Sequence, residues 1–95
     1  MNLTSFHNSE KPLSAKQLFS CTEGKVVAIN LKKDGELKEH TTKVPALLLC
    51  VKGTVIYEDE KAVKVTLNPG DFVEIETDVK HWLVAKENSE AILMK

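Results

Sequence analysis

Two histidines, His40 and His81, are the residues of this chain whose type and setting best suit chemistry. His40 lies in the stretch GELKEHTTKVPALLLCVKG, residues 35–53, and His81 lies in NPGDFVEIETDVKHWLVA, residues 68–85. If both stretches form strands that line one interior, the two imidazoles face one pocket. Imidazole binds transition metals and exchanges protons near neutral pH. The pair therefore predicts either a pocket for a small molecule or part of a metal site.

Other arrangements of catalytic side chains are missing from the sequence. It contains no carboxylate pair, no nucleophile beside a base and no glycine-rich phosphate loop. A histidine can act as a general base, but nothing in the sequence names a proton for it to move. Cys21 and Cys50 lack CxxC spacing, and we interpret them as reduced thiols, with Cys50 buried. The sequence thus favours a non-enzymatic protein and leaves an enzyme as the alternative.

Length, composition and charge indicate one small globular domain. The chain has 95 residues, 42% of them hydrophobic, and a formal net charge of −1. No run of Lys or Arg exceeds two residues, which argues against nucleic acid or an anionic membrane as a partner. The longest apolar run, Val44 to Val51, is too short to span a membrane, and the N-terminus lacks a signal-peptide pattern. We therefore expect a cytoplasmic protein.

From Lys25 onward the pattern is that of short β-strands separated by turns. Apolar runs and alternation predict strands over 25–31, 36–42, 46–51, 54–58, 61–67, 72–76, 81–85 and 91–94. Turn signals separate them, at 34–35, 52–53, 59–60, 69–70 and 88–90. This spacing predicts an all-β sandwich or barrel of antiparallel sheets with little or no helix. Residues 21–95 would form this single domain, and the polar residues 1–20 an irregular arm on the surface or on a partner subunit.

Two ordered motifs resemble those of the cupins, the small double-stranded β-helix (jelly-roll, RmlC-like) family. The first is Gly35 to Thr42 with its continuation to Gly53, and the second is Pro69-Gly70-Asp71 followed by His81. Residues 54–68 between them match the short hairpin spacer of compact members. The resemblance covers residues 25–95 and implies a small single-domain cupin of the type-2 conserved-barrel kind.

The resemblance also implies a metal site that this chain carries only in part. The family uses two histidines and a carboxylate from the first motif and one histidine from the second. His40 and His81 remain, whereas Thr42 and Ala46 stand at the other two positions. Alanine has no donor atom, and a threonine hydroxyl is a poor ligand for Zn²⁺, Fe²⁺ or Ni²⁺. We expect no tightly bound cofactor; the alternative is a divalent ion (Zn, Ni, Fe or Mn) held by His40 and His81.

The preferred functional interpretation is a non-catalytic pocket for a small molecule, rimmed by His40, Thr42, Ala46 and His81. One alternative is a metal-dependent enzyme, dioxygenase or isomerase-like, that uses the incomplete histidine pair. Another is a structural or regulatory subunit. The run from Ala46 to Val51 is apolar at every position, which is typical of a strand covered on both faces. We therefore expect a homodimer.

Overall fold

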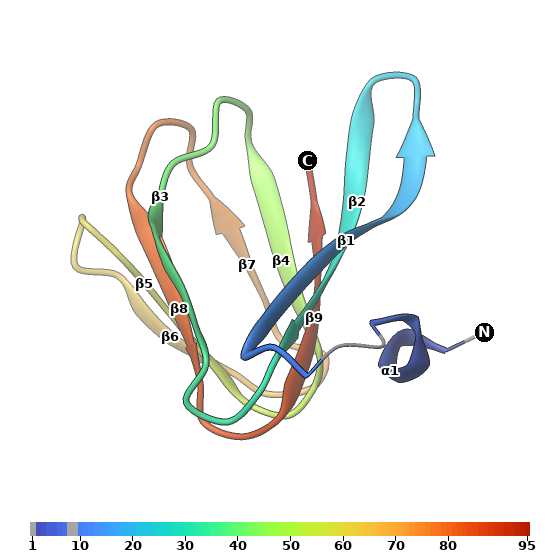
Figure 1. The fold of residues 1–95 in the computed structure, drawn as a ribbon. Coiled ribbons are helices and arrows are strands. Elements are labelled where there is room, and N and C mark those ends of the chain that lie inside the picture. The colour runs from blue at the N-terminus through green and yellow to red at the C-terminus, as the bar shows by residue number, and fades with distance from the viewer. Residues whose placement is uncertain (1, 8–9) are drawn as a thin grey trace.

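Antiparallel strands form nearly all of the regular structure in this computed structural model, which describes residues 2–7 and 10–95 (Figure 1). This confirms the all-β prediction. None of the described residues belongs to a helix long and apolar enough to cross a membrane. The elements are α1 (Leu3–Phe6), β1 (Leu13–Cys21), β2 (Gly24–Leu31), β3 (Glu36–His40), β4 (Ala46–Lys52), β5 (Val55–Asp59), β6 (Lys64–Leu67), β7 (Phe72–Ile75), β8 (His81–Ala85) and β9 (Ser89–Met94).

The strands form two sheets that face each other. A five-stranded sheet has the order β1-β2-β9-β4-β7, and a four-stranded sheet has the order β3-β8-β5-β6. Every pair of neighbouring strands is antiparallel. Apart from the hairpins β1–β2 and β5–β6, neighbouring strands are distant in sequence, so the chain crosses repeatedly between the sheets, as in a jelly roll.

The core lies between the sheets and follows from the alternation of side chains along each strand. On β4, Ala46, Leu48 and Cys50 point inward and are buried, while Leu47, Leu49 and Val51 point outward. Burial raises the pKa of the Cys50 thiol, which confirms the prediction of a buried cysteine; the side chain of Cys21 lies outside the described part. The buried core consists of Ile29, Leu31, Ala46, Leu48, Cys50, Val55, Tyr57, Leu67, Ile75, Leu83, Ala85 and Ala91.

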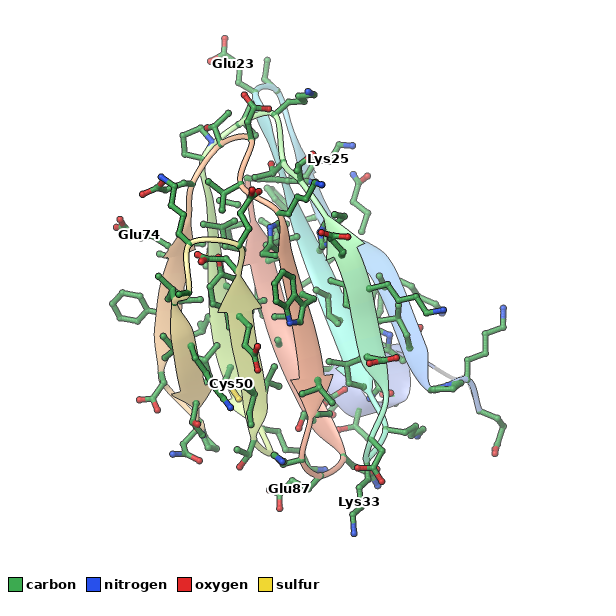
Figure 2. The ribbon with its side chains drawn as sticks, turned by 90° about the vertical axis from the view of Figure 1, so that its left-hand side faces the viewer. Glu23, Lys25, Lys33, Cys50, Glu74 and Glu87 are labelled. Carbon is green, nitrogen blue, oxygen red and sulfur yellow. The ribbon has the colours of Figure 1, made fainter. Side chains whose placement is uncertain are left out.

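The turns divide into two ends of the barrel, which we name from their places in Figure 1. The lower end holds the turns at 32–35, 53–54, 68–71 and 86–88; the upper end holds those at 22–23, 41–45, 60–63 and 76–80. Glu23 and Lys25 accordingly lie opposite Lys33 and Glu87 (Figure 2). Left-handed backbone occurs at predicted turns, with φ of 82° at Gly53 and 94° at Gly70.

Residues 13–20 do not form the irregular arm expected from their polar composition. They belong to β1, which pairs with β2 from Leu13 opposite Leu31 to Cys21 opposite Gly24, with a bulge between Gln17 and Phe19. The apolar strand β2 needs hydrogen-bond partners on both edges, and an edge strand can carry polar side chains. Backbone pairing with β2 therefore makes residues 13–20 a strand, although their side-chain pattern does not predict one.

Two predicted boundaries also differ from the structure. The last turn lies at 86–88 instead of 88–90, because Ser89 and Glu90 pair with Leu31 and Asn30 of β2 and so begin β9. β3 ends at His40 instead of residue 42, because the Thr42 hydroxyl forms a local turn with the backbone of Val44.

Candidate functional site

The structure brings His40 and His81 into direct contact. They are paired residues on the adjacent strands β3 and β8. The two Nε2 atoms lie 3.1 Å apart, and the ring centroids 4.1 Å apart. His81 is buried, and His40 is half-buried. Strand pairing thus positions the two imidazoles so that their outer nitrogens converge.

The two imidazoles carry too few N–H hydrogens for all of the hydrogen-bonding contacts that they make. The Nδ1 atom of His40 lies 3.1 Å from the carbonyl oxygen of Lys38, and that of His81 lies 3.1 Å from the carbonyl oxygen of Val79. A carbonyl can only accept, so each contact needs a hydrogen on Nδ1. Two neutral imidazoles carry only two such hydrogens, which leaves the contact between the Nε2 atoms without one. A further proton, a donor from a ligand or a metal ion would complete the pair.

The surroundings of His81 disfavour its protonation, which is one way to supply the missing hydrogen. Burial lowers the pKa of His81, and the charges of His40 and Lys95 act in the same direction, against the carbonyl of Val79 and the carboxylate of Asp59. His81 is therefore a neutral imidazole at pH 7. A proton on His81 is thus disfavoured, and a hydrogen-bond donor from a ligand or a metal ion could complete the pair.

The lowered pKa of His81 gives a prediction for acid stability. Because the folded state binds fewer protons than the unfolded state below pH 6.5, this stabilisation is present above that pH and is lost as the pH falls. Burial lowers the pKa of His7 in the same way. We expect the free energy of unfolding, measured with urea, to fall between pH 7.5 and pH 5.5. The fall should be smaller in His81→Asn; an equal fall in both proteins would contradict the assignment.

Tyr57 and Asp59 extend the site, and the sequence analysis missed both. The ring of Tyr57 stacks on His81 with centroids 5.9 Å apart, and its hydroxyl donates to Asp59 Oδ2 at 3.3 Å. Burial raises the pKa of Tyr57 to about 12, so the phenol stays protonated. The sequence pattern placed Asp59 in a turn. The structure extends β5 to Asp59, and Val55, Tyr57 and Asp59 occupy alternate positions on one face of that strand. This alternation is the sequence feature from which both residues could have been identified.

The histidine pair suits two ligands of one metal ion, but the set of four ligands is incomplete. Zn–N bonds of about 2.0–2.1 Å place two cis nitrogens roughly 3 Å apart. However, the described residues contain no group of three His, Cys, Asp or Glu side chains placed to hold a metal. Asp59 Oδ1 instead accepts hydrogen bonds from the backbone of Lys61 and Val63, at 2.9 and 3.2 Å. The residues present therefore do not fit the resident metal that the fold resemblance implies.

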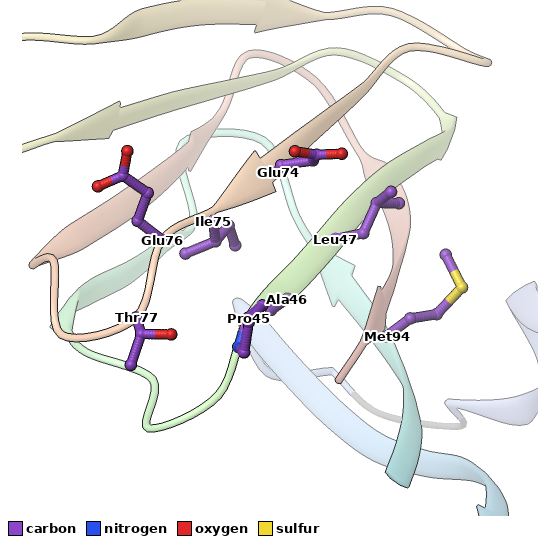
Figure 3. Close-up of a pocket in the computed structure, with 8 residues that line it drawn as sticks. All are labelled: Pro45, Ala46, Leu47, Glu74, Ile75, Glu76, Thr77 and Met94. Atoms are coloured by element: carbon purple, nitrogen blue, oxygen red, sulfur yellow. The ribbon is translucent and has the colours of Figure 1, made fainter.

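Thr42 and Ala46 line two different cavities. The Thr42 hydroxyl donates to the carbonyl of Val44 at 2.8 Å, and the residue borders a cavity of about 680 Å³. Ala46 borders another, of about 570 Å³, between the upper parts of β4 and β7 (Figure 3). Neither His40 nor His81 is among the residues that line these two cavities. The four residues predicted to rim one pocket are thus distributed around the upper end of the barrel.

The larger cavity lies at the upper end, between the β1–β2 turn and the β3–β4 loop, and is rich in lysine. Lys25, Lys43 and Lys95 line it, against one acid, Glu23. Lys43 also lies 3.4 Å from Asp78 in an exposed ion pair. The remaining lining residues are Gln17, Thr22, Gly24, Thr41, Thr42 and Val44.

Comparison with known proteins gives similarity in structure. No protein-family model matches the chain, and no curated protein does. A cupin superfamily protein from Desulfitobacterium hafniense superposes with a TM-score of 0.86 at 13% identity, over 98% of this chain and 84% of that one. A cupin-2 domain protein from Shewanella frigidimarina superposes with a TM-score of 0.81 at 16% identity, over 100% of this chain and 92% of that one. An RmlC-like cupin from the same organism superposes with a TM-score of 0.79 at 22% identity, over 87% of this chain and 74% of that one.

These similarities agree with the two facing sheets and their strand order. The resemblance inferred from the two sequence motifs is confirmed at the level of the fold. The protein therefore has the double-stranded β-helix fold of the small cupins.

Proposed function

We propose that this protein binds a small organic anion at the upper end of the barrel, without catalysing a reaction. The observation that carries the proposal is the cavity of about 680 Å³ lined by Lys25, Lys43 and Lys95 with the single acid Glu23. Its volume falls in the range of cavities that take small molecules. Asp78 pairs with Lys43, so three ammonium groups stand against two carboxylates, and the net positive charge favours carboxylates and phosphates.

The histidine pair supports the same proposal. The pair lies at the same end of the barrel as the cavity, since Thr41 and Thr42, which follow His40 directly, line it. The contact between the two Nε2 atoms lacks a hydrogen. A ligand hydroxyl or amide could donate to one of these nitrogens while its anionic group contacts the lysines. An anion that also carries a hydroxyl group, such as a hydroxy acid or a sugar acid, fits both features.

Substitution of the lysines tests this proposal. Thermal-shift screening of small hydroxy acids, sugar acids and sugar phosphates should find compounds that raise the melting temperature. For the best of them, we expect Lys25→Gln combined with Lys95→Gln to raise the Kd at least tenfold, because each ammonium contributes on the order of 1 kcal/mol. Isothermal titration calorimetry measures this change.

A control pair at the lower end keeps the net charge equal. Lys33→Gln combined with Lys86→Gln removes two positive charges far from the cavity and should leave the Kd within about twofold. Binding should also weaken as ionic strength rises. A Kd that is unchanged by the Lys25 and Lys95 substitutions would refute the proposed site.

The second candidate function is a metal-dependent enzyme. The separation of 3.1 Å between the Nε2 atoms of His40 and His81 favours it, because this spacing suits two ligands of one ion. Metal analysis of protein purified without an affinity tag distinguishes the two functions. One equivalent of tightly bound metal would replace the anion-binding proposal with the enzyme.

A further inference from the structure

The outer face of the four-stranded sheet, which is turned toward the viewer in Figure 2, carries Trp82, the single tryptophan of the chain. Side chains alternate along β8, so His81 and Leu83 are buried in the core while Trp82 points outward and is half-buried. β8 is an inner strand of this sheet, between β3 and β5. The indole ring therefore lies within the face and not at its edge.

Four charged side chains flank Trp82 on the neighbouring strands. On one side, Glu58 of β5 is the direct partner of Trp82, and Lys64 of β6 is the partner of Glu58. On the other side, the bulge in β3 sets two exposed residues, Lys38 and Glu39, opposite Trp82. Two acids and two bases cancel, so the surface around the indole ring has no net charge.

The polar groups of this surface remain available for hydrogen bonds to a ligand. Within residues 2–7 and 10–95, no group accepts a hydrogen bond from Trp82 Nε1. The ion pairs of Glu58 with Lys64 and of Glu39 with Lys80, at 3.8 and 4.0 Å, are too long to be hydrogen bonds. The face thus surrounds a flat apolar ring with N–H donors and carboxylate acceptors.

We propose that this face binds a neutral oligosaccharide, with one sugar ring stacked on Trp82. The C–H groups on one side of a sugar ring carry partial positive charge and pack against the negative face of the indole. The sugar hydroxyls both donate and accept hydrogen bonds, which matches the mixture of ammonium groups and carboxylates around the ring.

The charge balance favours a sugar over other ligands of an aromatic surface. Nucleic acid needs an excess of Lys and Arg to neutralise its phosphates, and the surface around Trp82 has no such excess. The core of a protein interface is depleted of charged side chains, whereas here four of them surround the indole ring. The proposed anion site at the upper end differs in the same way, because lysines outnumber acids there.

The shape of the face suits an extended ligand. Four strands about 4.8 Å apart place roughly 14 Å between the axes of β3 and β6, which is wider than one sugar ring. Val84, the next outward residue of β8, is also half-buried and extends the apolar surface beside the indole. A short oligosaccharide therefore covers more of this face than a single sugar does.

The fluorescence of Trp82 tests the proposal directly, because no other tryptophan contributes to the emission. The probes are cellopentaose, xylopentaose, maltopentaose and chitopentaose. We expect at least one of them to change the emission in a saturable way, with the same Kd by isothermal titration calorimetry. Because these probes are uncharged, that Kd should stay within about twofold as the ionic strength rises. A panel in which no probe gives a saturable response would refute the proposal.

Substitutions locate the binding site, with calorimetry as the measurement. For the best probe, we expect Trp82→Ala to raise the Kd at least tenfold, and Trp82→Phe, which keeps an aromatic ring, to raise it less. Phe72→Ala is the matched control, because it removes a ring that is 60% exposed on the other sheet, and it should leave the Kd within about twofold.

A second variant keeps the test valid if Trp82→Ala does not fold, which circular dichroism will show. Lys38→Ala removes an exposed hydrogen-bond donor beside the indole ring and should raise the Kd about threefold. A Kd that neither Trp82→Ala nor Lys38→Ala changes would contradict the assignment. Binding that is lost instead in Lys25→Gln combined with Lys95→Gln would place the sugar in the lysine-lined cavity and overturn the proposal.

Discussion

Thr42→His combined with Ala46→Glu is expected to bind Zn²⁺ or Ni²⁺ at least a hundredfold more tightly than wild type, a gain of about 2.7 kcal/mol. His40 and His81 already present converging Nε2 atoms 3.1 Å apart. Ala46 lies on the inner face of β4, in the opposite sheet, and side chains from facing sheets meet across roughly 10 Å. A glutamate there would supply an oxygen donor and the negative charge that a dication needs.

Calorimetric titration of both proteins measures this gain, and two further variants show its origin. Ala46→Glu alone should gain less, since Thr42 supplies no nitrogen. Adding His81→Asn to the double variant should abolish the gain. Circular dichroism must show a folded protein, because Thr42→His removes the hydroxyl contacts with Val44 and the glutamate enlarges a buried position. A folded double variant that gains no affinity would show that the new side chains at positions 42 and 46 do not reach the histidines.

Gly53→Ala is expected to lower the free energy of unfolding by about 3 kcal/mol, which corresponds to roughly 15 °C in melting temperature. An alanine Cβ at this position would lie 2.3 Å from Ser89 Oγ and 2.5 Å from the carbonyl oxygen of Asn88. Ser89 cannot move easily, because its hydroxyl accepts a hydrogen bond from Thr54 N and lies 2.7 Å from the carbonyl of Glu87. The φ of 82° adds left-handed strain of about 1 kcal/mol to this steric clash.

Gly70→Ala is the matched control for this prediction. Gly70 has a similar φ of 94°, but no atom lies within 4 Å of an added Cβ. Only the backbone strain remains, so we expect a loss of about 1 kcal/mol. Equal losses in the two variants, measured by urea unfolding, would show that the contact with Ser89 can relax.

Most of the fold could be predicted because hydrophobic alternation and turn chemistry agree along residues 25–85. β8 matches its predicted bounds, and Gly53 and Gly70 have the left-handed backbone that turns require. β1 could not be predicted in this way. Its stability comes from backbone pairing with β2, and an edge strand needs no particular side-chain pattern. A strand formed by such pairing leaves little trace in a single sequence.

The site was predictable only where a residue type is itself unusual. Two histidines in matching motifs were enough to identify the contact between His40 and His81. The roles of Tyr57 and Asp59 depend on the register of β5 against β8, which sets Asp59 opposite His81. This register could not be predicted from the sequence, because it depends on how strands distant in the chain pair with each other. The separate cavities at Thr42 and Ala46 depend on loop packing and were likewise hidden.

The contact between His40 and His81 also has a consequence for folding kinetics. The two residues are 41 positions apart in the chain, and closing a loop of that length costs about 3 kcal/mol of chain entropy. The hairpin of β5 and β6 lies within this loop and can form earlier from local contacts. If the histidine contact forms only after the transition state, a ligand that completes the pair stabilises a contact absent from it. Such a ligand slows unfolding and leaves the rate of folding unchanged.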